Sequence, residues 1–189
     1  MRNEVNPCKV ITGPNVRWSY ANVWEPRSFN GGPAKYSVSL IIPKSDTETL
    51  DKIRQAIQAA YEAGITKLQG KDRSAPAFES LSLPLRDGDV DHAGDPAYEG
   101  CMFINASSRV APGIVDANRQ PIVDHSLVYS GVYGRASIVF YAFNYSDGSA
   151  ESKGIACGLN NLQKIRDGEP MGTRIPAEED FDECDDDFL

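Results

Sequence analysis

The feature that most constrains the fold is one long stretch, residues 127–145, in which apolar side chains alternate with aromatic and cationic ones. Such alternation is typical of a β-strand whose two faces meet different surroundings. We therefore expect one face of this strand to pack in a core and the other to be aromatic and cationic. The expected core face comprises Val128, Val132, Ala136, Ile138, Phe140 and Ala142. The opposite face comprises Tyr129, Tyr133, Arg135, Ser137, Tyr141, Phe143 and Tyr145.

Further strands are indicated by the same period of two elsewhere in the chain. Gly131 and Gly134 should let the long strand bend sharply, as closure of a barrel requires. Asp147-Gly148 is a strong hairpin signal that should join the long strand to the last one. The sequence therefore predicts a mainly β protein. The additional strands are expected at 16–24, 35–43, 98–110 and 153–159.

The connection after the first strand is expected to be a mobile loop. Pro26 and the turn residues 30–33 should break the strand, because proline removes a ladder donor and glycine favours turns. The loop carries Arg27 and Phe29 and is a candidate binding finger.

One helix is expected after the second strand. Ser45 and Glu48 have the spacing of a capping box, and apolar residues then recur at helical spacing from Leu50 to Tyr61. Gly64 should end the helix in a left-handed conformation. The helix should pack its apolar stripe on the sheet. Residues 67–96 are rich in Gly, Pro, Ser and Asp, which predicts a long excursion with at most short strand pieces.

The last 13 residues, 177–189, contain eight acidic residues and no basic one. The chain has 27 acidic and 19 basic residues, so the remaining 19 acids are balanced by the 19 bases, and the net charge of −8 belongs to this tail. Dense like charge with little apolar area predicts a disordered, exposed tail. The folded domain is accordingly expected at 1–176.

The cysteines and the ends of the chain indicate an intracellular protein. Cys8, Cys101, Cys157 and Cys184 are scattered without a C-x-x-C pair, which predicts reduced thiols and neither a zinc site nor a disulfide framework. The first residues lack a signal-peptide core, and the longest apolar run, 138–143, is too short to span a bilayer. We expect a soluble protein with no membrane contact.

The aromatic and cationic strand face is the strongest functional signal. Interleaved aromatic and basic residues stack bases and hold phosphates in single-strand binders, each stacked base contributing roughly 1–3 kcal/mol. The alternative is that these aromatics fill a second apolar layer beneath the helix or the long loop. The candidate DNA-contacting residues on this and neighbouring segments are Arg17, Trp18, Tyr20, Trp24, Arg27, Lys35, Lys71, Arg73, Arg86, Phe103, Arg109, Tyr129, Tyr133, Arg135, Tyr141, Phe143 and Tyr145.

An acidic cluster leaves an enzymatic alternative open. Asp87, Asp89 and Asp91, with His92, alternate in a short loop and suggest a metal-dependent nuclease, but the calcium-loop pattern ending in a bidentate Glu is not met. No Gly-rich phosphate loop and no GxSxG elbow is found, so we expect neither nucleophilic catalysis nor a cofactor.

The tail has three possible roles. It is a solubilising appendage, or its carboxylates imitate a phosphate backbone and occupy the body's own binding groove at an effective concentration on the order of millimolar. In the third case it grips a basic protein and the body binds no DNA, which is the DNA-mimicking alternative. The residues expected to make its contacts are Phe181, Asp185, Asp186, Asp187, Phe188 and Leu189.

Several separated motifs are similar to those of the tailed-phage single-stranded DNA-binding protein family, long catalogued as a domain of unknown function. The resemblance covers nearly the whole body. The motifs are VRWSY at 16–20, KYS at 35–37 leading to LIIPK at 40–44, LRDGD at 85–89, YSG at 129–131 and GLNN at 158–161.

The resemblance implies an OB-fold, a five-stranded barrel with loop insertions. It implies a non-enzymatic protein that coats single strands non-specifically during phage DNA replication or recombination, in the cytoplasm of the bacterial host. The acidic tail with its terminal hydrophobic residues is similar to tails that recruit replication proteins such as a polymerase, helicase or primase. This tail ends in Phe-Leu where the bacterial type ends in Pro-Phe. A homo-oligomer is an open alternative to a monomer.

Overall fold

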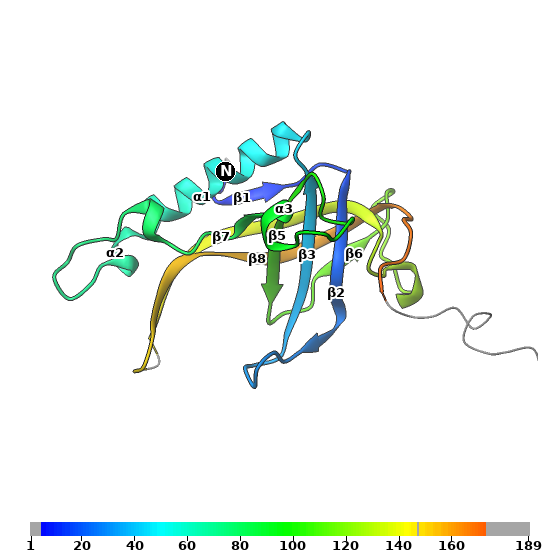
Figure 1. The fold of residues 1–189 in the computed structure, drawn as a ribbon. Helices are drawn as coiled ribbons and strands as arrows, with labels where there is room; N and C mark the ends of the chain where they lie inside the picture. Colours follow the sequence, from blue (N-terminus) through cyan, green and yellow to red (C-terminus); the bar gives the residue numbers. More distant parts are fainter. Residues whose placement is uncertain (1–4, 147, 173–189) are drawn as a thin grey trace, which may run out of the picture.

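The protein is described by a computed structural model that covers residues 5–146 and 148–172 (Figure 1). These residues form eight strands, one long helix and several helical segments of three or four residues. In chain order they are β1 (Lys9–Ile11), β2 (Val16–Arg27), β3 (Lys35–Pro43), α1 (Thr47–Ala63), α2 (Ile65–Leu68), η1 (Phe78–Ser80), β4 (Leu85–Asp87), α3 (Gly88–Asp91), β5 (Cys101–Ser108), β6 (Gly113–Val115), η2 (His125–Leu127), β7 (Tyr133–Ser146) and β8 (Glu151–Arg166).

Five of the strands form a barrel in the order β2, β3, β5, β8 and β7, with β7 returning to β2. Neighbouring strands are antiparallel except β5 and β8, which run parallel. The barrel closes through two pairs between β2 and β7, at Val16 and Arg17, and through one pair, Ser107 with Gly158, between β5 and β8. Because both closures are short, the barrel is partly open. This arrangement confirms the predicted OB-fold.

The predicted core face of the long strand is confirmed. All six residues of that set, from Val128 to Ala142, are buried. They share the barrel interior with Leu40 and Ile42 of β3 and with Ile104 of β5. The alternation in the sequence therefore identified correctly which side of this strand faces inward.

The one long helix is present, and its apolar stripe packs against the barrel at β1 and β7 (Figure 1). Its predicted cap is wrong: Asp46, not Ser45, accepts a hydrogen bond from the Thr49 N–H at 3.2 Å. Gly64 ends the helix at a φ of −99°, which is not left-handed. A Cβ at Gly64 would lie 2.3 Å from the Ala142 Cβ, so close packing against β7 explains this glycine. No helix in the two described ranges is long and apolar enough to cross a membrane.

Four strands have bounds that differ from those expected: β5 is shorter than 98–110, β8 is longer than 153–159, and β2 and β7 also differ. β2 continues through Pro26 to Arg27, because beyond Arg17 it has only β3 as a paired neighbour and proline is tolerated at an edge. β7 begins at Tyr133, because residues 128–132 form a loop after η2.

The two glycines of the long segment also meet requirements other than the expected bend. Gly131 has a positive φ of 122°. Gly134 leaves room for the Trp18 ring, since a Cβ there would lie 2.6 Å from the Trp18 Cζ2 atom. The pairing of β7 with β8 also has an irregularity between Tyr133 and Gly134, a local kink at the second of the two expected positions.

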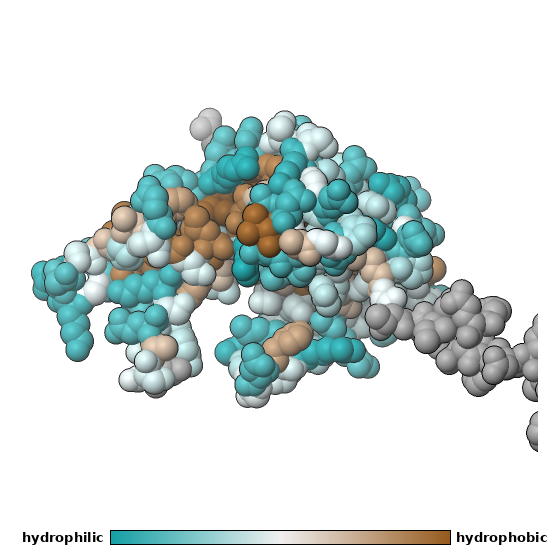
Figure 2. All heavy atoms as spheres, viewed as in Figure 1, coloured by the Kyte–Doolittle hydropathy of each residue, from teal (hydrophilic) through white to brown (hydrophobic). Residues whose placement is uncertain are grey.

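Two long hairpins, β2–β3 and β7–β8, extend beyond the barrel. In Figure 2 the tip of the β2–β3 hairpin projects from the lower edge of the body, separated by a deep indentation from the β7–β8 hairpin. The pairing of Ser146 with Glu151 confirms the second hairpin, although Asp147 of its expected turn lies outside the described residues. The predicted tail, 177–189, and the boundary at Pro176 also lie outside them.

Three of the four cysteines can be placed. Cys8, Cys101 and Cys157 are free thiols, as expected, and Cys184 lies outside the described residues. Burial raises the pKa of Cys157, which lies in the barrel core. The thiol at this position is therefore a packing group.

Candidate nucleic-acid interface

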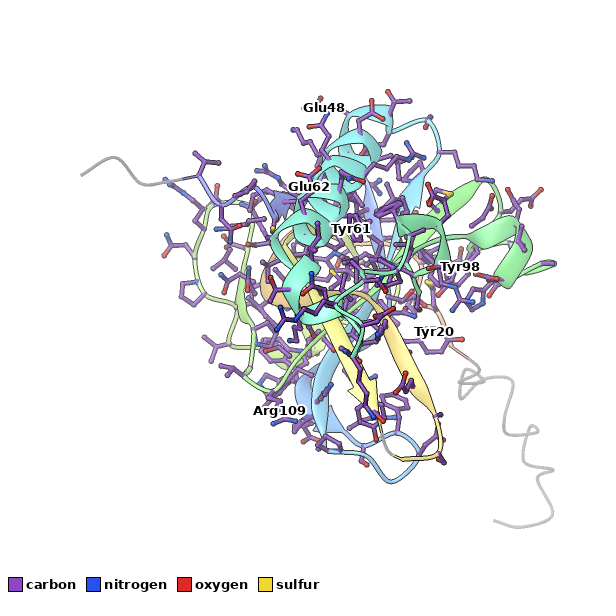
Figure 3. The ribbon with its side chains drawn as sticks, turned by 90° about the vertical axis from the view of Figure 1, so that its left-hand side faces the viewer. Tyr20, Glu48, Tyr61, Glu62, Tyr98 and Arg109 are labelled. Carbon is purple, nitrogen blue, oxygen red and sulfur yellow. The ribbon has the colours of Figure 1, made fainter. Side chains whose placement is uncertain are left out.

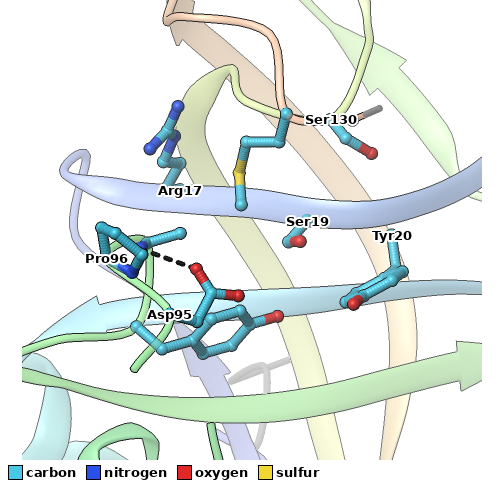
Figure 4. A pocket seen from close by; sticks show the side chains of 10 residues that line it. Arg17, Ser19, Tyr20, Asp95, Pro96 and Ser130 are labelled. Carbon is cyan, nitrogen blue, oxygen red and sulfur yellow. Dashed lines mark hydrogen bonds between the residues drawn. The ribbon is translucent and has the colours of Figure 1, made fainter. Parts of the chain in front are cut away.

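The outer face of β2, β3 and β5 carries a groove made of two adjoining hollows of about 620 and 370 Å³. Both hollows are lined by Tyr20 and Tyr98, so they form one continuous surface, which we call the groove. Figure 4 shows the first hollow, with Arg17 above Pro96 and Asp95 at the left and Tyr20 at the right. The groove residues are Arg17, Ser19, Tyr20, Asn22, Phe29, Ser37, Val38, Ser39, His92, Asp95, Pro96, Ala97, Tyr98, Asn105, Ser130, Met171 and Gly172.

The floor of the groove is flat and polar. Ser39 of β3 pairs with Ser19 of β2 on one side and with Asn105 of β5 on the other. Ser37 lies two residues earlier on β3 and therefore on the same face. Asn105 is exposed and Ser37 half-buried on this floor, whereas Ser19 and Ser39 are each only 3% exposed, so a ligand would meet Ser37 and Asn105 first.

Tyr20 stands at the centre of the groove and is 64% exposed. It lies in a β-bulge of β2, between the pairs Ser19 with Ser39 and Asn22 with Ser37. Phe29, 62% exposed in the β2–β3 connection, lines the second hollow. Exposed rings beside a polar floor are suited to stacking against planar groups.

The opposite wall of the groove is an aromatic stack. The His92 ring lies parallel to the Tyr98 ring at a centroid distance of 3.9 Å, and Phe103 meets both rings edge-on. The Tyr98 hydroxyl donates to the Ser39 Oγ atom at 3.3 Å. Tyr98 is only 1% and Phe103 only 2% exposed, so Tyr98 supports the wall from within, and the prediction that the Phe103 ring contacts DNA is wrong.

Ion pairs hold this wall to the barrel. Lys44 at the end of β3 contacts Asp87 at 2.8 Å and Asp89 at 2.6 Å, and Arg86 contacts Asp91 at 2.7 Å. The hydrogen bonds that Lys44 donates to Asp87 and Asp89 raise the pKa of Lys44, and the bond that Asp89 accepts from Lys44 lowers the pKa of Asp89.

These pairs bear on the metal-dependent nuclease alternative. Asp87, Asp89 and Asp91 are divided between two cations and do not converge. The described residues contain no group of three or more His, Cys, Asp or Glu side chains that could hold a metal ion. The geometry therefore gives the nuclease alternative no support.

Positive charge flanks the groove along the β2–β3 hairpin. Lys35 shares a strand face with Ser37, and Arg27 is its direct partner on β2. Within the described residues neither side chain has an ion pair. Arg109 follows the end of β5, but in the view of Figure 3 it lies well away from Tyr20, to the other side of this hairpin. Arg27 and Lys35 thus extend the groove, whereas Arg109 lies outside it.

Arg17 connects the groove to the segment that follows β8. Its Nε donates to the Gly131 carbonyl at 3.2 Å, and its Nη2 donates to the Glu169 carbonyl at 2.6 Å. We call residues 167–172 the C-terminal strap. The strap brings Met171 into the first hollow, where it packs beside Tyr98.

Two of the predicted tyrosines support the strap and its surroundings. The Tyr129 hydroxyl donates to the Gly168 carbonyl at 2.9 Å, and the ring of Tyr133 is covered by Arg166 at 3.6 Å. Both rings are half-buried. They shape the end of the groove, although neither lines the hollows themselves.

Two predicted tryptophans do not reach the groove. Trp18 is fully buried in the barrel core, so the prediction that it extends a stacking platform is wrong. Trp24 is half-buried, donates from its indole N–H to the Val128 carbonyl at 3.3 Å and stacks on His125 at 4.0 Å. Large aromatic area drives burial when the strand period places it inward.

The aromatic and cationic face of β7 forms a second surface on a different part of the barrel. Arg135 lines a separate hollow with Arg119 between β1 and β6. Further along β7, Tyr141 is 44% and Tyr145 is 60% exposed. Phe143 is half-buried, close to Gly154 of β8.

Two further candidates also stand apart from the groove. Lys71 and Arg73 are exposed in the loop after α2. The candidate residues from the sequence thus fall on several surfaces, and the groove unites only Arg17 and Tyr20, flanked by Arg27 and Lys35; Arg86 is paired with Asp91 and lies over the Phe103 ring at 5.9 Å.

Sequence reasoning missed His92 and Tyr98 as a groove wall. The sequence places His92 beside the acidic cluster and predicts a strand from Tyr98, whereas β5 begins at Cys101. The neighbouring turn residues, Gly94 and Pro96, were the available signal, because they predict a loop that can fold back on a sheet.

Comparison with known proteins confirms the resemblance found in the sequence. The family model described as the Enterobacter phage Enc34 ssDNA-binding protein matches residues 8–189. Putative protein p50 of Acyrthosiphon pisum secondary endosymbiont phage 1 is 28% identical over 177 residues, which are 89% of this chain and 90% of that relative.

Two solved structures of the bacteriophage Enc34 single-stranded DNA-binding protein have the same fold. A C-terminal truncation is 24% identical, with a TM-score of 0.67 over 87% of this chain and 88% of the other. The complex with ssDNA is 26% identical, with a TM-score of 0.66 over 87% and 90% of the two chains. The present chain therefore belongs to the family of the Enterobacter phage Enc34 single-stranded DNA-binding protein.

Proposed function

We propose that this protein binds single-stranded DNA without sequence preference, in the groove across β2, β3 and β5, and that it acts by binding and not by catalysis. The observation that carries the proposal is the exposed ring of Tyr20 at the centre of a polar, three-stranded floor. The Enc34 relative that was solved with ssDNA has the same fold and supports it.

The groove offers each part of a single strand a suitable partner. Tyr20 and Phe29 present ring faces on which bases stack, a contact that every base can make. Arg17, Arg27 and Lys35 supply charge for phosphates. Because stacking and phosphate contacts do not depend on the identity of the base, this set of partners favours binding without sequence preference.

The outer face of β7 is a second candidate contact for the same strand. Tyr141 and Tyr145 are exposed there, with Arg135 further along. Lys71, Arg73 and Arg109 lie on exposed segments. A long single strand that passes beyond the groove would meet these residues, which adds phosphate contacts without adding specificity.

The proposal includes a role for the acidic tail. The described chain ends at Met171 and Gly172, both of which line the groove, so residues 177–189 follow closely after that point. Eight acids tethered there compete with DNA phosphates for the groove cations. When DNA displaces the tail, its Phe188 and Leu189 become available to replication proteins such as a polymerase, helicase or primase.

Fluorescence titration with labelled oligo(dT) at low salt tests the function. The full chain should bind, and a chain that ends at Pro176 should bind more tightly, with the difference shrinking as salt screens the tail. Absence of binding by both proteins would contradict the proposed function. Equal affinity of the two would remove only the role of the tail.

Magnesium- or manganese-dependent cleavage of labelled DNA would instead favour the nuclease alternative. A tail peptide that captures a basic protein, together with a body that has no affinity for DNA, would favour the DNA-mimicking alternative.

A further inference from the structure

Tyr20 has an unusual backbone for a bulky residue inside a strand. Its φ of 47° lies in the left-handed region, which costs L-residues free energy and marks a position that the surroundings must enforce. Of the other non-glycine residues with positive φ in the described ranges, Arg73 and Arg119 lie in hydrogen-bonded turns and Asn30 is of a type that tolerates this region. Tyr20 alone among these four lies within a named strand.

The bulge at Tyr20 determines which way its ring points. Trp18 is buried, and in a regular strand Tyr20, two residues later, would share its inward face. The pairs Ser19 with Ser39 and Asn22 with Ser37 instead leave two residues of β2 opposite Val38 alone. The extra residue shifts the alternation, so Tyr20 lies in the groove and Val23 is buried again.

Ser130 supplies the hydrogen bond that the bulge needs. The Ala21 N–H donates to the Ser130 Oγ atom at 3.0 Å. β7 cannot serve here, because it pairs with β2 only at Val16 and Arg17. The carbonyl of the same peptide unit, that of Tyr20, accepts a hydrogen bond from the Asn22 side chain at 3.2 Å.

Ser130 is itself held firmly in place. The next residue, Gly131, donates from its N–H to the Trp18 carbonyl at 2.7 Å, and the Ser130 carbonyl accepts from the Met171 N–H at 2.8 Å. A Cβ at Gly131 would lie 2.2 Å from the Glu169 carbonyl oxygen, so this glycine lets the strap lie directly against the loop. The loop is thus clamped between β2 and the C-terminal strap.

We propose that Ser130 is a positioning residue for DNA binding: its hydroxyl holds the β-bulge that turns Tyr20 from the core face of β2 into the groove. This inference rests on the proposed function, since it concerns how the groove presents its central ring. The hydrogen bond from Ala21 to Ser130 holds the strained backbone at Tyr20. Without this bond, the backbone relaxes from its left-handed conformation.

The test compares full-length Ser130→Ala with full-length Ser126→Ala, a matched control in the preceding segment whose hydroxyl donates to Asp124 and does not touch the bulge. Ser130→Ala should weaken oligo(dT) binding about tenfold, and Ser126→Ala should leave it unchanged. Ser130→Thr, which keeps the hydroxyl, should restore most of the affinity.

A second comparison separates positioning from direct contact. In a Tyr20→Ala background, Ser130→Ala should cause no further loss, because the ring that it positions is already absent. In protein that contains 3-fluorotyrosine, the fluorine NMR signal of Tyr20, assigned by its absence in Tyr20→Phe, should shift in Ser130→Ala without DNA.

Each outcome bears on a different claim. Wild-type protein without affinity for oligo(dT) would overturn the proposed function itself. Wild-type binding that Ser130→Ala leaves intact, a Tyr20 signal that does not move, or losses that add in the double variant would overturn the positioning role and leave the function standing.

Discussion

The Arg17 guanidinium donates to the Glu169 carbonyl oxygen over 2.6 Å. A residue that lines the groove therefore also anchors the C-terminal strap, from which the acidic tail continues. A DNA phosphate that binds the Arg17 guanidinium must compete with this hydrogen bond. The groove and the strap are consequently linked through one side chain, in addition to any competition by the tail.

Arg17→Gln should loosen the strap as well as weaken DNA binding. Without the guanidinium, the amide of Met171, which donates to Ser130, should exchange with deuterium about tenfold faster. Amide exchange followed by mass spectrometry measures this. Arg54→Gln on the exposed side of α1 is the control. Unchanged exchange at 167–172 in Arg17→Gln would show that the strap does not depend on Arg17.

The β2–β3 hairpin should contribute phosphate contacts. Each contact to a single strand adds about 0.7 to the slope of log affinity against log salt, so Arg27→Gln with Lys35→Gln should reduce the slope by about 1.4. Oligo(dT) titrations at several salt concentrations measure it. The control pair, Lys52→Gln with Arg54→Gln, lies on α1 and should leave the slope as in the wild type. If the Arg27→Gln and Lys35→Gln pair also leaves the slope unchanged, the DNA does not contact this hairpin.

The left-handed backbone at Tyr20 should determine which of two variants, Tyr20→Gly or Tyr20→Ala, is more stable. Alanine retains the strain at a φ of 47°, whereas glycine relieves about 1–2 kcal/mol of it and costs about 0.5–1 kcal/mol of unfolded-chain entropy. Tyr20→Gly should therefore be more stable than Tyr20→Ala by about 0.5–1 kcal/mol in denaturant unfolding.

Tyr141, in the regular part of β7, provides the matched control. There glycine should be less stable than alanine, because no left-handed strain is relieved. The same order at both positions would contradict a strained backbone at Tyr20.

Gly64→Ala should destabilise the fold, because the new Cβ would lie 2.3 Å from the Ala142 Cβ and force α1 away from β7. Overpacking of this kind costs about 1–3 kcal/mol. Chemical denaturation gives the value, and Glu62→Ala, on the exposed side of the same helix, should change stability by less than about 0.5 kcal/mol. A neutral Gly64→Ala would mean that the helix end has room to move.

Periodicity predicted the fold well because burial in a β-barrel follows a period of two. The buried side of β7 and the bounds of β3 agree with the alternation in the sequence. The capping residue of α1 was missed because Ser45 and Asp46 are both good caps, and only the backbone geometry decides between them.

The site was harder to predict because side-chain direction along β2 changes at one residue. Trp18 and Tyr20 have the same parity in the sequence, yet the bulge sends the first into the core and the second into the groove. The wall formed by His92 and Tyr98 depends on a loop that folds back over β3 and β5; Gly94 and Pro96 predict the loop, but the contact it makes joins distant segments and has no local pattern.

The central claim, that single-stranded DNA lies across β2, β3 and β5, is tested most directly by photo-crosslinking. The full chain is irradiated with an oligonucleotide that contains 5-bromodeoxyuridine, and the modified peptides are identified by mass spectrometry. Cross-links are expected at Tyr20 and Phe29, and a Tyr20→Ala variant should lose the cross-link at position 20. Cross-links confined to Tyr141, Phe143 and Tyr145 of β7, with none in the groove, would contradict the central claim.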